Sequence, residues 1–137
     1  MRFLLDTNAL SEPLRPAPKA TFVRKYRKHA GELAIGSVTW HEALYGVARL
    51  AEGKRRRAVE RYLREVVAAT MEILPYTAAA AEWHATERAR LGVRGRNMPF
   101  ADGQIAAIAR VNGLVLVTAN ERDFRDFEGL QVENWLS

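Results

Sequence analysis

The segment Asn112-Gly113-Leu114-Val115-Leu116-Val117-Thr118-Ala119-Asn120 decides the fold class. Its apolar run, Leu114–Val117, lies between Asn112-Gly113, a helix-stop signal, and a polar turn at residues 118–120. A short continuous apolar run with such boundaries predicts a parallel strand that is buried on both faces. The polar turn should then lie at the carboxyl end of that strand.

Other short apolar runs on either side of this segment predict further strands, at Phe3–Leu5, Leu33–Ile35 and Met71–Leu74, with a last short edge strand at Leu130–Val132. Longer stretches between them predict helices over Lys19–His29, Val38–Ala51, Lys54–Ala69, Ala78–Leu91 and Phe100–Val111. This alternation indicates an α/β fold with a mostly parallel sheet of four to five strands, joined by right-handed crossovers.

Length and composition favour one ordinary globular domain over residues 1–137, with 48% hydrophobic and 27% charged residues. The absence of cysteine excludes disulfides and thiolate metal sites, which leaves oxygen and imidazole as ligands. The uninterrupted apolar run before Asp6 has only three residues, too few for a signal-peptide core or a spanning helix, so we expect a cytoplasmic protein without membrane contact.

The net charge of +5 is unevenly distributed. Residues 120–137 hold five acids and two bases, which leaves +8 for the first 119 residues. Clustered basic side chains displace counterions from phosphates, so this balance favours nucleic acid or an acidic protein as a partner.

Two aspartates mark the most promising functional positions. Asp6 directly follows the first strand, at the sheet edge where open α/β folds bind ligands, although an Asp there also caps short helices. Asp102 begins an apolar helical stripe that continues through Ile105, Ala106 and Ala109. Its inward position favours a metal-binding role, whereas a first-turn acid stabilised by the helix dipole is the simpler alternative.

A further acid and a polar turn complete the candidate site. Glu42 lies in the first turns of the helix for which Ser37 is the expected N-cap; on its own, it reads as a solvated helix residue. After the Leu114–Val117 strand, either Asn120 or Asp123 can join the cluster. Several carboxylates close together repel one another unless a cation is bound, and oxygen ligands suit Mg²⁺ or Mn²⁺.

Three motifs in this order resemble those of PIN-domain proteins, specifically the VapC-type toxins and the similar FitB. They are Leu5–Pro16, Ser37–Glu42 and Phe100–Ala107, and the resemblance spans nearly the whole chain. It implies a three-layer α/β/α fold and metal-dependent hydrolysis of RNA by activated water, without a covalent enzyme intermediate. Mg²⁺ is the implied cofactor, with Mn²⁺ as an alternative.

Carried over by position, the resemblance makes Asp6, Glu42 and Asp102 the metal-site acids, with Asp6 and Asp102 as the direct ligands. Asp123 is our choice for the fourth acid, with Asn120 as a polar support. Hydrogen bonds that orient these carboxylates are expected from Thr7, Asn8 and Thr118.

The resemblance also implies partners: an RNA substrate, a second copy in a homodimer, and a cognate antitoxin that covers the acidic pocket and carries the contact with operator DNA. Candidate RNA-binding side chains are Arg94 and Arg96, in the loop before the Asp102 helix, and Lys54, Arg55 and Arg56 on a basic helix. The basic helix is equally well explained as a solvated face.

Two rival functions stay open at this point. A receiver-like signalling domain also gathers acids around Mg²⁺, but the turn at residues 118–120 lacks the Lys that such a domain needs. A PIN module that binds nucleic acid with weak or no catalysis is the second rival. Asp6, Glu42 and Asp102 argue against it, whereas Asn120 argues for it.

Overall fold

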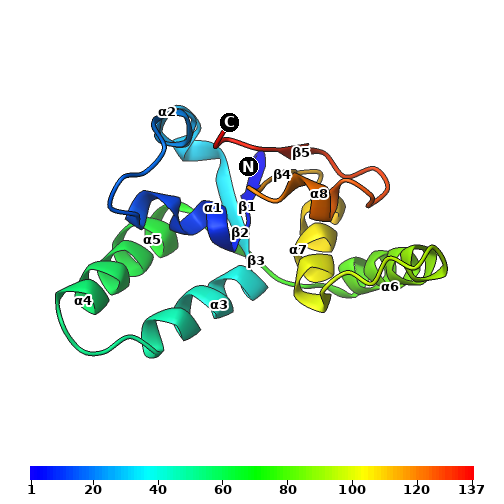
Figure 1. The fold of residues 1–137 in the computed structure, drawn as a ribbon, viewed down its shortest axis with the longest axis horizontal. Coiled ribbons are helices and arrows are strands. Elements are labelled where there is room, and N and C mark those ends of the chain that lie inside the picture. Colours follow the sequence, from blue (N-terminus) through cyan, green and yellow to red (C-terminus); the bar gives the residue numbers. More distant parts are fainter.

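The computed structural model describes residues 1–137 and contains one five-stranded parallel sheet in the order β3-β2-β1-β4-β5 (Figure 1). Its strands are β1 (Phe3–Leu5), β2 (Leu33–Gly36), β3 (Glu72–Leu74), β4 (Val115–Val117) and β5 (Val132–Glu133). Its helices are α1 (Thr7–Ser11), η1 (Glu12–Leu14), α2 (Ala20–Lys28), η2 (Ala30–Glu32), α3 (Ser37–Ala48), α4 (Lys54–Arg61), η3 (Tyr62–Val67), α5 (Ala68–Thr70), α6 (Ala78–Val93), α7 (Phe100–Val111) and α8 (Glu121–Phe124).

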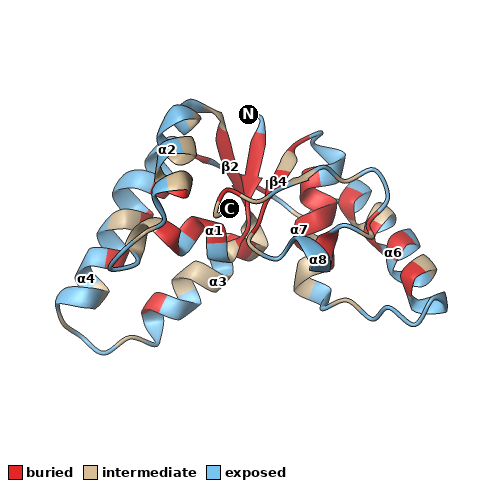
Figure 2. Cartoon of the chain, turned by 45° about the horizontal axis from the view of Figure 1, so that its top comes forward, coloured by how far each residue is buried: buried red, intermediate tan, exposed pale blue.

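The sheet is the middle of three layers, with α1 to α5 on one side and α6 to α8 on the other (Figure 1). Alternation along β1 explains the two cores: Phe3 and Leu5 pack with the first group of helices, whereas Leu4 packs with α6 and α7. Because both faces are covered, β1 and β2 are buried throughout and β4 is buried except at Val115 (Figure 2), which confirms the interpretation of the continuous apolar runs.

The predicted elements are confirmed with small changes at their ends. The sheet is parallel throughout, including the edge strand β5. The expected helix over Lys54–Ala69 is one continuous helical path, but a π-helical segment, η3, interrupts it between α4 and α5. None of the helices combines the length and the apolar character needed to cross a bilayer.

The carboxyl ends of the central strands meet at one edge of the sheet. In the parallel register, Leu5 pairs with Ile35 on one side and with Val117 on the other. Asp6, the start of α3 and Thr118 therefore follow three neighbouring strands at this edge, where α/β sheets bind their ligands.

Candidate active site

Asp6 is held at this edge by its neighbours in the chain and in the sheet. Its backbone N–H donates to the Val117 carbonyl, 3.0 Å away, which brings its side chain beside Thr118. The Thr118 hydroxyl donates to Oδ2 over 2.5 Å, and the Ala9 N–H donates to Oδ1 over 2.8 Å. Asp6 is thus the N-cap of α1, so the capping role coexists with a position at the functional edge.

Asp6 as a whole residue is only 5% exposed. Burial raises its pKa and the charge of Glu42 raises it further, whereas hydrogen bonds from Thr118 and from the backbone N–H groups of Ala9 and Asn8 oppose the shift. The Asn8 side chain itself is exposed. Each oxygen of Asp6 has one side-chain or backbone donor at hydrogen-bond distance and keeps a lone pair for another partner.

Glu42 approaches from α3. It is half-buried, and its Oε1 accepts a hydrogen bond of 3.2 Å from the Thr7 hydroxyl. The expectation that Ser37 caps α3 is wrong, because β2 runs directly into the helix: Gly36 occupies the N-cap position and Ser37 is the first helical residue. One turn before Glu42, the fully buried Thr39 hydroxyl has no hydrogen-bond partner.

Asp102 connects the remaining acids. It is half-buried in the first turn of α7, and its pKa is raised first by burial and then by the charges of Asp123, Asp6 and Glu42. Asp123 is exposed in α8, and Asn120 is exposed just before it and donates its backbone N–H to the Thr118 hydroxyl over 3.0 Å. Four carboxylates from four helical segments therefore share one electrostatic environment.

This donor set fits a hard divalent cation. It consists of carboxylate oxygens with hydroxyl support and no sulfur, the ligands that Mg²⁺ and Mn²⁺ prefer. As the side chains lie, no three acidic or histidine residues converge closely enough to coordinate one ion.

The predicted basic residues divide into bound and free groups. Arg55 donates to the Leu14 carbonyl over 3.0 Å and lines a groove that reaches Glu42. Arg56 donates to Glu60, and Arg96 forms an ion pair of 2.7 Å with Asp126. Exposed side chains without an ion pair are found at Lys54 and Arg94.

Two buried polar residues of α6 escaped the sequence reasoning. His84 is 4% exposed and lies against Gly103 of α7, and Glu87 accepts hydrogen bonds from Arg90 and from the backbone N–H of Glu128. A histidine and a glutamate on a helix carry no sequence signal of burial, because their partners come from other elements. Gly103, a glycine inside the predicted helix over Phe100–Val111, was the one available hint that another element packs closely against that helix.

The chain matches the family model of the PIN domain over residues 3–130. It is 34% identical over 135 residues to the tRNA(fMet)-specific endonuclease VapC of Shigella flexneri, with 98% of each chain covered. Among solved structures, FitAcB from Neisseria gonorrhoeae superposes with a TM-score of 0.86 at 30% identity and 97% coverage of each chain. A member of the VapBC family of toxin-antitoxin systems, VapBC-5 from Mycobacterium tuberculosis, gives 0.71 at 28% identity, with 97% of this chain and 96% of that chain covered.

Proposed function

The chain belongs to the PIN-domain family, and on that premise we propose that residues 1–137 form one PIN domain that is the endoribonuclease toxin of a toxin–antitoxin pair. The observation that carries the proposal is the group of carboxylates at the ligand-binding edge of the sheet: the Thr7 hydroxyl donates to Glu42 next to the buried Asp6, and burial, followed by the charges of Asp123, Asp6 and Glu42, raises the pKa of Asp102. Such a cluster is costly unless it binds a cation or a cationic partner.

Asp6, Glu42 and Asp102 would hold the divalent cation, with Asp123 as the fourth acid and Asn120 as a polar support. Mg²⁺ is our first choice and Mn²⁺ the second. When bound, the cation supplies a polarised water and neutralises charge on the phosphodiester.

The surrounding hydrogen bonds orient the carboxylates. Thr118 aims Asp6 by donating to Oδ2, and Thr7 steadies Glu42 in the same way. Asp123, which is exposed, is the acid with the freest access to solvent and to a substrate water. No serine, cysteine or histidine nucleophile is needed, since water attacks phosphorus directly.

A groove beside the site suits the antitoxin. Apolar side chains from η1, α3, α4 and η3 line it, and Thr7 and Glu42 stand at its polar end. An amphipathic antitoxin segment could bury its apolar side chains there and extend a basic residue toward Glu42. In this arrangement the antitoxin blocks the acidic site and supplies the contact with operator DNA. The apolar lining consists of Leu14, Ala43, Val47, Leu50, Val59, Tyr62 and Leu63.

We further propose that the toxin acts on RNA in the cytoplasm as a homodimer. The excess of positive charge in the first 119 residues supports a polyanionic substrate. Among the basic residues, Arg94 and Lys54 carry the freest charges for backbone contacts.

The test is cleavage of a labelled RNA pool by the purified protein with Mg²⁺, Mn²⁺ or chelator. Asp6→Asn, Glu42→Gln and Asp102→Asn should each lower the rate by more than about 100-fold, since changes to outer-shell groups alone cost 10- to 100-fold. Glu82→Gln, an exposed acid on α6, is the matched control and should cut like the wild type. Binding of RNA without cleavage under any metal would replace the nuclease by a nucleic-acid-binding module.

Comparing Asp123→Asn with Asn120→Ala separates the two candidates for the fourth position. A loss confined to Asp123→Asn supports the assignment above, and a loss confined to Asn120→Ala reverses it. For the groove, Leu50→Glu should abolish inhibition by the protein encoded beside this gene, whereas Val93→Glu, on the far end of α6, should leave inhibition intact.

A further inference from the structure

Phe100 is an exposed aromatic residue beside the acidic site. It opens α7, two residues before Asp102, and 51% of its surface is exposed. Large aromatic side chains are usually buried, because each removes a large apolar area from water. Side chains two positions apart on a helix point about 200° apart, so the ring lies at the same end of α7 as Asp102 but faces α6.

His84 backs this ring from α6. The two ring centroids lie 4.9 Å apart with a tilt of 41°. The Tyr76 hydroxyl is 2.8 Å from His84 Nδ1. Gly103 leaves space for the His84 imidazole, since a Cβ at position 103 would overlap that ring. Phe100 therefore rests on a buried support that fixes one of its sides and leaves the rest open.

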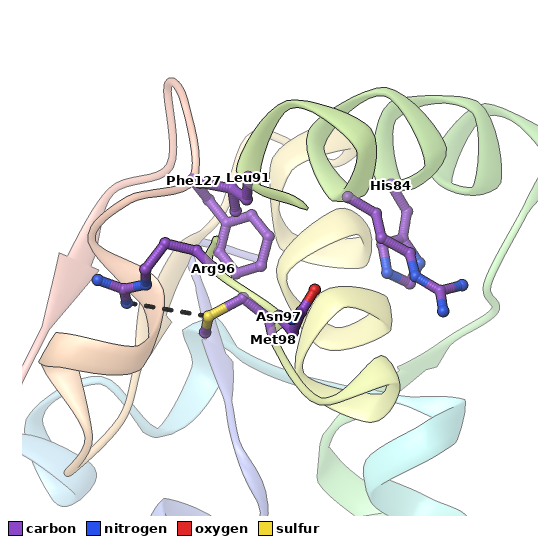
Figure 3. A pocket seen from close by; sticks show the side chains of 7 residues that line it. His84, Leu91, Arg96, Asn97, Met98 and Phe127 are labelled. Atoms are coloured by element: carbon purple, nitrogen blue, oxygen red, sulfur yellow. Dashed lines mark hydrogen bonds between the residues drawn. The ribbon is translucent and has the colours of Figure 1, made fainter. Parts of the chain in front are cut away.

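One arginine without an ion pair lies against the ring. The Arg88 guanidinium lies 5.3 Å from the Phe100 centroid and has no carboxylate partner. A pocket between α6 and the loop before α7 continues from it, lined by His84, Asn97 and Met98, with Arg96 at its other end (Figure 3). Arg94 adds a second unpaired charge in the same loop.

An exposed aromatic ring with an unpaired arginine beside it is an arrangement that binds unpaired nucleotides, because a base stacks on the ring and a phosphate meets the guanidinium group. We propose that Phe100, supported by His84 and flanked by Arg88, stacks an unpaired nucleobase of the RNA strand that enters the acidic edge over the start of α7. This inference rests on the proposed nuclease function and assigns its substrate a single-stranded segment. Bases inside an A-form duplex cannot reach such a ring.

A second copy of the chain fits this patch less well. A symmetric contact through it would bury Arg88 of both copies without a carboxylate partner, which is costly. A phosphate backbone instead supplies the missing negative charge to each arginine.

The experiment measures binding and cleavage of a short single-stranded RNA that carries 2-aminopurine at successive positions. In Phe100→Leu, which keeps apolar bulk but loses the aromatic face, affinity should fall by about 5- to 100-fold, the range expected for one stacked base. KM should rise more than kcat falls, and 2-aminopurine quenching should disappear at one position. Phe100→Trp should restore the affinity and the quenching, which keeps the test valid if the leucine variant folds poorly.

Two further variants make the result specific. Tyr45→Leu removes an equally exposed aromatic residue on α3, likewise flanked by an arginine, and should leave the quenching at that position unchanged. Arg88→Gln should reduce the slope of log affinity against log salt by about 0.7, the loss of one phosphate contact to a single strand.

Different failures point to different conclusions. A wild-type protein that cuts no RNA refutes the proposed function itself. A wild type that cuts, with Phe100→Leu matching it in affinity and quenching, refutes only the stacking site. A change of oligomeric state in RNA-free Phe100→Leu would show that the ring packs between copies, and it would overturn the assignment as well.

Discussion

Thr118→Val tests how Asp6 is held. Thr118 is 1% exposed, and its hydroxyl donates to the Asp6 carboxylate and accepts from the Asn120 N–H. Valine has nearly the same shape, so the change removes two hydrogen bonds and leaves little cavity. One bond to a charged group contributes about 1.5–3 kcal/mol and one neutral bond about 0.5–1.5 kcal/mol. We therefore expect the free energy of unfolding to fall by about 2–4 kcal/mol.

Urea denaturation measures this loss directly. With an m-value of about 2 kcal/mol per molar, the midpoint should drop by about 1–2 M. Thr118→Ser is the matched control, because it keeps the hydroxyl and loses only a methyl group, worth about 1 kcal/mol. A valine variant within about 0.5 kcal/mol of the wild type, or a serine variant that falls as far as valine, would refute the reasoning.

The same variant has a defined pH dependence. The Thr118 hydroxyl lowers the pKa of Asp6 by stabilising its charged form, so its removal raises that pKa further. The folded variant then binds a proton more tightly than the folded wild type. Its loss of stability should be largest above the pKa that Asp6 has in the folded variant, and should shrink as the pH falls from there to the pKa of Asp6 in the folded wild type, which itself lies above the ordinary value of 3.8.

Three other changes give distinct expected outcomes in the same urea assay. Without metal, Asp102→Asn should raise the free energy of unfolding by about 1 kcal/mol at pH 8 but not at pH 3. Burial and neighbouring carboxylates raise the pKa of Asp102 in the folded protein, so its charged form, which dominates at pH 8, destabilises the fold. Glu87→Gln should lower the free energy of unfolding by about 1–2 kcal/mol at neutral pH, because the Glu87 carboxylate accepts hydrogen bonds from Arg90 and from the Glu128 N–H. Arg90 lowers the pKa of Glu87, so the carboxylate stabilises the fold above that pKa, and the effect of the change should shrink as the pH falls. Gly103→Ala should cost about 1–3 kcal/mol because its Cβ would overlap the ring of its α6 neighbour, and an unchanged stability would contradict the close packing of these helices.

Much of the fold could be predicted from local patterns. Strands buried on both faces have continuous apolar sequences, and β1 and β4 lie within the apolar runs Phe3–Leu5 and Leu114–Val117 that predicted them. The ends of elements were less predictable. Ser37 is a good N-cap by type, but β2 leads into α3 without a loop, so the cap position falls on Gly36.

The site could be predicted only for residues that directly follow a strand, because the parallel sheet brings the ends of neighbouring strands together. Asp6 and Thr118 follow strands, and the parallel register of those strands brings them together. His84 follows no such rule. His84 and Gly103 are 19 positions apart in the chain, and their contact depends on how α6 and α7 cross. Helical periodicity alone does not predict that crossing.

Binding of Mn²⁺, followed by the loss of its free-ion EPR signal, tests the central claim most directly, because every proposed role of the acidic edge depends on a cation. The account predicts saturable binding by the wild type, competed by Mg²⁺, that Asp6→Asn and Asp102→Asn each weaken strongly while Glu82→Gln does not. Absence of binding at millimolar Mn²⁺, or equal binding by Asp6→Asn, would contradict a cation site at these carboxylates.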